Sequence, residues 1–160
     1  MLRIEFDRTI DTDLPATELW NVMKEAFEDP ASSPVWPVDL EKTRPIELRR
    51  GAEVAATYRV GPVAVEAAYH ITEFEPGVRF RYESSPSHPL AGGATVEAEP
   101  RQQGSQLHWT GRYRARLHPL APFAYLFVRL YFIETFFRRL EENLRAYENT
   151  TPPERTGEPR

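Results

Sequence analysis

Apolar residues recur at three- and four-residue steps through the C-terminal part of the chain, from His118 to Asn149. This spacing predicts one helix of about eight turns with a buried apolar stripe. Pro119 and Pro122 mark its start, because proline is favoured in the first turn of a helix. The expected stripe consists of Leu120, Phe123, Leu126, Phe127, Leu130, Ile133, Phe137, Leu140, Leu144 and Tyr147.

Residues 2–40 predict a strand, a helix and an irregular segment. Apolar and polar residues alternate from Leu2 to Ile10, which is typical of a strand. Pro15 suits the first turn of a helix. The apolar face of that helix is Leu19, Trp20, Met23 and Phe27. Prolines interrupt residues 28–40, so this segment, which contains Trp36, is expected to be irregular.

Residues 41–117 predict a meander of antiparallel strands with three checkable turns. Gly61-Pro62 and Pro76-Gly77 would form tight turns, and residues 102–105 a longer loop. The expected partners are Tyr58 with Val65, Ala56 with Ala67 and Val54 with Tyr69; then Ile71 with Tyr82 and Tyr69 with Ser84; then Ala98 with Trp109, Val96 with Gly111 and Ala94 with Tyr113. Each register puts apolar residues opposite apolar residues, as a sheet with one buried face requires.

These registers place small and aromatic residues together on the inner face of the sheet. They are Ala56, Ala67, Ala94, Ala98 and Gly111 with Tyr58, Tyr69, Tyr82, Trp109 and Tyr113. Small residues opposite a helix leave volume, and an unfilled methyl-sized gap costs on the order of 1 kcal/mol. Either rings from the helix fill this space or a ligand does. The tyrosines favour a ligand, since apolar walls with a few hydroxyls are typical of a small-molecule site.

The composition is that of an ordinary globular protein. The 160 residues suit one domain, expected over residues 1–149, with a disordered polar tail over 150–160. The net charge of −4, with basic residues interleaved among acids, gives no indication of nucleic-acid binding. The absence of cysteine excludes disulfides, thiolate metal sites and cysteine nucleophiles. No targeting signal or transmembrane segment is visible, so we expect a cytoplasmic protein.

The chain carries few candidates for catalysis or metal binding. It has no Gly-x-Ser-x-Gly motif, and its four histidines lack metal-ligand spacing, so we expect neither a metal nor a cofactor. Alternation sends His70 and His108 to the outer face of the sheet. Glu134 is the main candidate for acid–base chemistry because it borders the apolar stripe. The alternative is a carboxylate at the rim, in contact with solvent or an arginine.

The order of elements and several local motifs carry a resemblance to a known superfamily. The motifs are Ile10-Asp11 to Pro15 with Glu18-Leu19-Trp20, the Trp36-Pro37 region, Glu73 to Phe80, and Gly104-Ser105-Gln106-Leu107-His108-Trp109. With them the chain resembles the START/Bet v 1-like (SRPBCC) superfamily, in its polyketide cyclase/dehydrase-like branch. The resemblance implies an α+β helix-grip fold, in which a curved antiparallel sheet of about seven strands wraps around a long C-terminal helix. It also implies a cavity between sheet and helix, but no shared catalytic motif.

We therefore predict a protein that binds a hydrophobic small molecule, lipid-like or aromatic, between the sheet and the C-terminal helix. An alternative is a cyclase- or dehydratase-type enzyme, in which pocket tyrosines and a carboxylate act on a polyketide-like substrate. A further alternative is an interaction module with a filled core. The expected ligand-binding residues are Trp36, Tyr58, Tyr69, Tyr82, Trp109, Tyr113, Phe127 and Glu134.

The first half of the predicted helix is apolar nearly all round. Opposite the expected stripe lie Ala124, Val128, Tyr131 and Phe132. An apolar outer face of this kind needs a second cover. We expect a homodimer through this face, or failing that a membrane-adjacent patch.

Overall fold

The computed structural model describes residues 2–38, 40–60, 62–117 and 119–150. It defines their side chains except at 40–43, 58–60, 63 and 65. Ten of the eleven residues of the expected disordered tail, 151–160, lie outside the described residues, while Thr150 ends the last helix. Disorder of the tail and a single domain over residues 1–149 therefore stay predictions.

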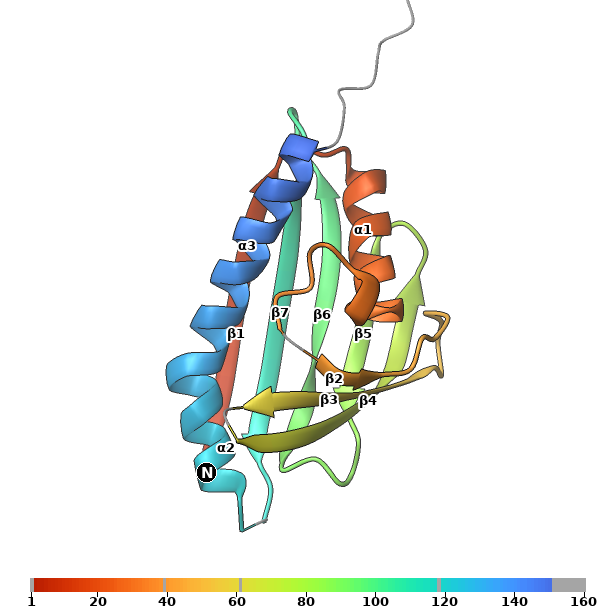
Figure 1. The fold of residues 1–160 in the computed structure, drawn as a ribbon. Coiled ribbons are helices and arrows are strands. Elements are labelled where there is room, and N and C mark those ends of the chain that lie inside the picture. Colours follow the sequence, from red (N-terminus) through yellow and green to blue (C-terminus); the bar gives the residue numbers. More distant parts are fainter. Residues whose placement is uncertain (1, 39, 61, 118, 151–160) are drawn as a thin grey trace, which may run out of the picture.

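Seven antiparallel strands form one sheet in the order β1-β7-β6-β5-β4-β3-β2. The strands are β1 Arg3–Thr12, β2 Leu40–Thr43, β3 Glu53–Val60, β4 Val63–Glu75, β5 Arg79–Ser84, β6 Leu90–Pro100 and β7 Ser105–Ala115. Helix α1 (Ala16–Glu28) packs against β6 and β7, and the C-terminal helix runs alongside β1 on the same side of the sheet (Figure 1). This arrangement confirms the α+β helix-grip fold.

Two of the three predicted strand registers are confirmed. Across β3 and β4, Ala56 pairs with Ala67, and across β4 and β5, Ile71 pairs with Tyr82. The third prediction is wrong by two residues, since Trp109 pairs with Val96 rather than with Ala98. The reason is the position of the loop, which spans residues 101–104 and ends at Gly104.

Gly104 fixes that loop because its backbone adopts a conformation that other residues disfavour. Its φ is +73°, in the left-handed region. The Arg101 amide donates a hydrogen bond to the Gly104 carbonyl at 3.2 Å, which closes the loop one residue earlier than expected. A Cβ at position 104 would lie 2.0 Å from the carbonyl oxygen of Thr12, so β1 also excludes a side chain here.

The C-terminal helix begins at Ala121 and changes its winding halfway. It consists of α2 (Ala121–Phe127), a π-helical turn η2 (Val128–Phe132) and α3 (Ile133–Thr150). A π turn holds more residues than an α turn, so it rotates the preceding side chains around the helix axis. The buried face therefore does not continue in phase through the whole helix.

The predicted apolar stripe is confirmed in α3 but wrong before η2. Ile133, Phe137, Leu140 and Leu144 are buried, together with Phe136, which the pattern missed. Leu120, Phe123, Leu126 and Leu130 are instead 60, 72, 51 and 71 % exposed. The residues that face the core before α3 are Ala121, Ala124, Tyr125, Val128 and Phe132. Of the four residues expected on the outer face, Tyr131 alone is exposed. The other three, Ala124, Val128 and Phe132, face the core because η2 rotates this part of the helix.

Aromatic rings occupy much of the interior expected to be hollow. The ring of Phe6 lies over Gly111, where a Cβ would come within 2.2 Å of the Phe6 Cζ. Phe136 and Phe137 each place their ring centroids 5.3 Å from that of Trp109. The small residues of the sheet thus accept rings from β1 and α3.

None of the described helices combines the length and the apolar character that crossing a membrane requires.

Candidate functional site

Three tyrosines and a tryptophan from the inner face of the sheet form a cluster beneath the C-terminal helix. We call Tyr69, Tyr82, Tyr113 and Trp109 the tyrosine cluster. The Trp109 indole Nε1 donates a hydrogen bond to the Tyr82 hydroxyl at 3.1 Å, and Tyr82 also shares a side-chain hydrogen bond with Tyr113. The rings of Tyr69 and Tyr82 meet edge to face at 5.3 Å. The strands β4, β5 and β7 therefore bring together four of the predicted site residues.

Burial favours the neutral form of the Tyr69 and Tyr82 phenols. Desolvation raises the pKa of Tyr69 to about 12. Desolvation likewise raises the pKa of Tyr82, and the nearby Tyr69 adds to this, although the hydrogen bonds with Tyr113 and Trp109 act in the opposite direction. At neutral pH both groups are neutral hydroxyls, which can donate a hydrogen bond to a carbonyl or hydroxyl oxygen.

His88 lies beside this cluster and was not among the predicted site residues. Its ring centroid is 5.6 Å from that of Tyr69, and its Nδ1 lies 3.0 Å from the Leu90 carbonyl oxygen and 3.1 Å from the Leu90 amide nitrogen. Desolvation and the positive charge of Arg116 lower the pKa of His88, while a backbone hydrogen bond at Leu90 raises it. His88 sits in the connection between β5 and β6, where strand alternation gives no signal for its orientation.

Trp36 joins the loop after α1 to the aromatic interior. Its ring lies 5.1 Å from that of Phe27 and 5.7 Å from that of Phe136. The side-chain amide of Asn143 donates to the backbone carbonyl of Val35 at 3.1 Å, which ties this loop to α3. The indole Nε1 of Trp36 is buried and has no hydrogen-bond partner among the described residues.

The remaining predicted site residues are not part of the cluster. The backbone of Tyr58 pairs with Val65 in the sheet, but its side chain lies outside the described residues. Phe127 is half-buried, with its ring 5.7 Å from Tyr131 and 6.1 Å from Phe132. Glu134 does not face the interior, contrary to expectation.

Glu134 is exposed at the rim between α3 and the sheet, where it forms an ion pair with Arg8 of β1. Its neighbour Ile133 takes the buried position of that turn. The carboxylate therefore matches the alternative interpretation, a rim group paired with an arginine. Such an exposed pair contributes little to stability.

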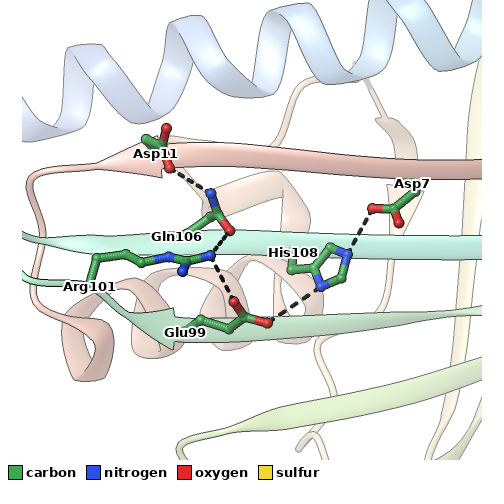
Figure 2. Close-up of polar contacts among 6 residues, drawn as sticks. All are labelled: Asp7, Asp11, Glu99, Arg101, Gln106 and His108. Carbon is green, nitrogen blue, oxygen red and sulfur yellow. Dashed lines mark hydrogen bonds and ion pairs between the residues drawn. The ribbon is translucent and has the colours of Figure 1, made fainter.

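A polar network covers the outer face of β1, β7 and β6, on the side of the sheet away from the core (Figure 2). His108 bonds through Nε2 to Asp7 Oδ1 at 2.8 Å, and its Nδ1 lies 3.5 Å from Glu99 Oε1. Arg101 pairs with Glu99 at 3.1 Å and also contacts Gln106, which donates to Asp11 at 2.8 Å. Side-chain atoms of Glu97, Glu99 and His108 that could ligate a metal ion come within 4.8 Å of one another. Two of these side chains already have partners, since His108 contacts Asp7 and Glu99 pairs with Arg101.

Two open hollows of the described surface lie away from the tyrosine cluster. One, of about 400 Å³, is lined by Asp11, Thr12, Asp13, Gln103, Arg145, Glu148 and Asn149. The other, of about 500 Å³, is lined by Glu5, Phe6, Asp7, Arg81, Gly93, Thr110, Gly111 and Arg112. Both hollows are mainly polar and open to solvent. The tyrosine cluster is therefore the better candidate for binding an apolar small molecule.

Solved structures share this fold across nearly the whole chain. Ara h 8.0201 is 13% identical with a TM-score of 0.63, covering 90% of this chain and 99% of its own. A protein from Nitrosomonas europaea is 16% identical with a TM-score of 0.62, covering 92% and 97%. A Thalictrum norcoclaurine synthase point mutant, in complex with a transition-state analogue, is 12% identical with a TM-score of 0.57, covering 88% and 96%. At these identities the likeness concerns the fold alone.

The sequence itself gives a family match. No curated protein matches the chain at a significant level. Residues 3–147, which include every strand and helix up to the last turn of α3, match the family described as polyketide cyclase / dehydrase and lipid transport. The predicted membership of the START/Bet v 1-like superfamily is thereby confirmed, and the chain belongs to the polyketide cyclase / dehydrase and lipid transport family.

Proposed function

We propose that this protein binds a hydrophobic small molecule that carries an oxygen acceptor, in the space between the sheet and α3. The observation that carries the proposal is the unpartnered indole N–H of Trp36 within an aromatic interior. A buried donor without an acceptor costs about 1–3 kcal/mol. A ligand oxygen at this position would recover that cost, while the surrounding rings would contact the apolar body of the ligand.

Phe136 occupies the position that such a ligand would take. Its ring lies between the two indoles, 5.7 Å from Trp36 and 5.3 Å from Trp109. A ligand would displace this ring and reach the Trp36 N–H on one side and the Tyr82–Trp109 pair on the other. The neutral Tyr69 and Tyr82 hydroxyls supply further donors. The family includes lipid transport proteins, which supports a hydrophobic ligand of this kind.

Two substitutions test this site in opposite directions. The probe is anilinonaphthalene sulfonate, whose fluorescence rises in apolar surroundings and whose sulfonate oxygens accept hydrogen bonds. Phe136→Ala should tighten binding because it empties the position between the indoles. Trp36→Phe keeps a ring but removes the N–H, so it should weaken binding about three- to tenfold, the effect of one lost hydrogen bond.

Trp20→Phe serves as the matched control, since Trp20 packs against Phe74 and Phe80 on a different part of the core. It should leave the dissociation constant unchanged. Absence of saturable binding in both the natural protein and Phe136→Ala would contradict the proposal. Native mass spectrometry of protein from its own host would show the mass of a retained ligand.

A second candidate is an enzyme of the cyclase or dehydratase type. His88 favours it, because a neutral imidazole beside the Tyr69 ring is a potential general base near a phenol donor. Mass spectrometry of a linear poly-β-ketone incubated with the protein would reveal a cyclised or dehydrated product. The His88→Gln variant should abolish that product, while Trp36→Phe should alter binding of the substrate. An unchanged substrate in the presence of the natural protein would rule this candidate out.

A further inference from the structure

A histidine and two glutamates bring metal-ligating atoms together on the outer face of the sheet. Glu97 and Glu99 are two residues apart on β6, so their side chains leave the same face of the strand. His108 lies directly opposite Glu97 on β7. One ligating atom from each of the three side chains lies within 4.8 Å of the others. The ligands come from two strands, which is why the spacing of residues along the sequence predicted no metal.

The neighbours of His108 and Glu99 contact one polar atom of each side chain and leave the other. His108 Nε2 lies 2.8 Å from Asp7 Oδ1 (Figure 2). Arg101 donates a hydrogen bond to Glu99 Oε2 at 3.1 Å. The second polar atoms of the two side chains, His108 Nδ1 and Glu99 Oε1, face each other at 3.5 Å. The existing contacts therefore leave one ligating atom of each side chain for a metal ion.

The separation of these two atoms is that of two ligands of one ion. An ionised carboxylate can only accept, so in a neutral imidazole Nε2 carries the proton donated to Asp7 and Nδ1 is an acceptor. Nδ1 and the Glu99 oxygen then repel each other unless a cation lies between them. Their 3.5 Å separation exceeds the roughly 2.7–3.2 Å of an N–H···O hydrogen bond. It is close to the distance of about 3.4 Å between two ligands that bind a tetrahedral Zn²⁺ ion at about 2.1 Å each.

The charge at this point also favours a cation. Three carboxylates, one from β1 and two from β6, lie there with one guanidinium, that of Arg101. The half-buried side chain of Glu97 forms no hydrogen bond or ion pair with another described residue. Arg79, opposite Glu97 on β5, pairs instead with Glu75 at 3.2 Å. The negative charge of Glu97 is therefore available to a bound ion.

We propose that Glu97, Glu99 and His108 bind a divalent transition-metal ion on the outer face of β6 and β7. An imidazole nitrogen with carboxylate oxygens is a ligand set that suits Zn²⁺, whereas Mg²⁺ and Ca²⁺ are bound by oxygen ligands. Asp7 would fix the tautomer and the orientation of the His108 ring, as carboxylates commonly do for histidines that ligate a metal. Three protein ligands leave a fourth position for water or for an external ligand. The sheet separates this site from the tyrosine cluster, so the proposal does not depend on a ligand in the interior.

Competition with a chromogenic zinc chelator at neutral pH tests the proposal on the full chain. The natural protein should withdraw one equivalent of Zn²⁺ from the chelator. His108→Gln removes the nitrogen ligand and should abolish this binding at the same protein concentration. Asp7→Asn keeps the size of the side chain but removes the charge that orients the ring, so it should weaken binding by about 10- to 100-fold.

His70→Gln is the matched control. His70 is also half-buried on the outer face, with Glu53 and Glu83 opposite it on the two neighbouring strands. Its substitution removes the same ring from a similarly acidic surface and should leave Zn²⁺ binding unchanged. Absence of Zn²⁺ binding by the natural protein, or equal binding by the natural protein and His108→Gln, would overturn the proposal. So would displacement of Zn²⁺ by a similar concentration of Mg²⁺, because the carboxylates alone would then account for the binding.

Discussion

Replacing Gly111 with alanine would test whether the ring of Phe6 fills the interior beside the sheet. Gly111 pairs with Phe6 across β7 and β1, and the ring folds back over it. An added Cβ would lie 2.2 Å from Phe6 Cζ and 2.3 Å from Cε1, well inside van der Waals contact. The ring is flanked by Tyr113, stacked at 6.4 Å, and by Phe137 at 5.5 Å. It cannot move aside without disturbing one of them.

The expected effect is destabilisation by about 1–3 kcal/mol, the usual cost of an extra methyl group in a packed region. This sign is informative, because glycine-to-alanine changes in compatible backbone normally stabilise by about 0.4–1 kcal/mol. The backbone of Gly111 is not in the left-handed region, so alanine meets no strain there. Urea unfolding followed by circular dichroism measures the difference as a shift in midpoint.

A second substitution makes the reasoning refutable. Phe6→Leu alone leaves a gap over Gly111 and should also destabilise the protein. In the double variant the alanine methyl enters the vacated space, so the two effects should be less than additive by about 0.5–3 kcal/mol. A stabilised Gly111→Ala protein, or strict additivity in the double variant, would show that the ring does not fill this space.

Three further predictions concern the same structure. Tyr82→Phe should lower the unfolding free energy by about 1–3 kcal/mol in urea titrations, because the buried Trp109 N–H loses its acceptor; an effect no larger than that of exposed Tyr131→Phe would contradict this. Burial raises the Tyr69 pKa from 10.0 to about 12. The stability linked to this neutral phenol is therefore present below pH 10 and lost as the pH rises to about 12. Tyr69→Phe should reduce this alkaline loss of stability in thermal melts. Gly104→Ala should lower the free energy of unfolding by more than the strain of a left-handed residue, about 1–2 kcal/mol, because its Cβ also meets the Thr12 carbonyl. Gly51 has a positive φ but open space around it, so Gly51→Ala should show the effect of the strain alone.

The sheet shows how far alternation of residues determines a register. The β3–β4 and β4–β5 registers follow from short turns that contain glycine and proline, and both were predicted. The β6–β7 register was wrong by two residues, and a shift of two keeps every side chain on the same face. Alternation therefore cannot separate the two registers. Gly104 decides between them through its approach to Thr12, a contact with β1 that is distant in the sequence.

Strand alternation also placed some residues of the candidate site and not others. Tyr69, Tyr82, Trp109 and Tyr113 share the inner face as their parity predicts, although their role in binding stays a prediction. His88 could not be predicted because it lies between β5 and β6, where strand alternation does not apply. Glu134 was misplaced because its orientation depends on the phase of the helix. Apolar residues surround nearly the whole helix before α3, so periodicity could not show that phase.

The residues that the C-terminal helix buries change along its length. Helix α2, which contacts β6 and β7, buries Ala121 and Tyr125. In α3, the rings of Phe136 and Phe137 pack against Trp109, and Phe137 also packs against Phe6, whose ring lies over Gly111. Large residues opposite small ones is the arrangement that fills an interior without voids.

The π turn lies between α2 and α3. A regular α-helix would carry the stripe of Ile133 and Phe137 back to Leu130, Leu126 and Phe123, so these residues would turn towards the sheet. By rotating them outward, η2 moves apolar side chains to the surface. The buried face of α3 and the exposed apolar residues before η2 are therefore two results of one packing arrangement, and a family member with a regular helix here should lack the exposed apolar face.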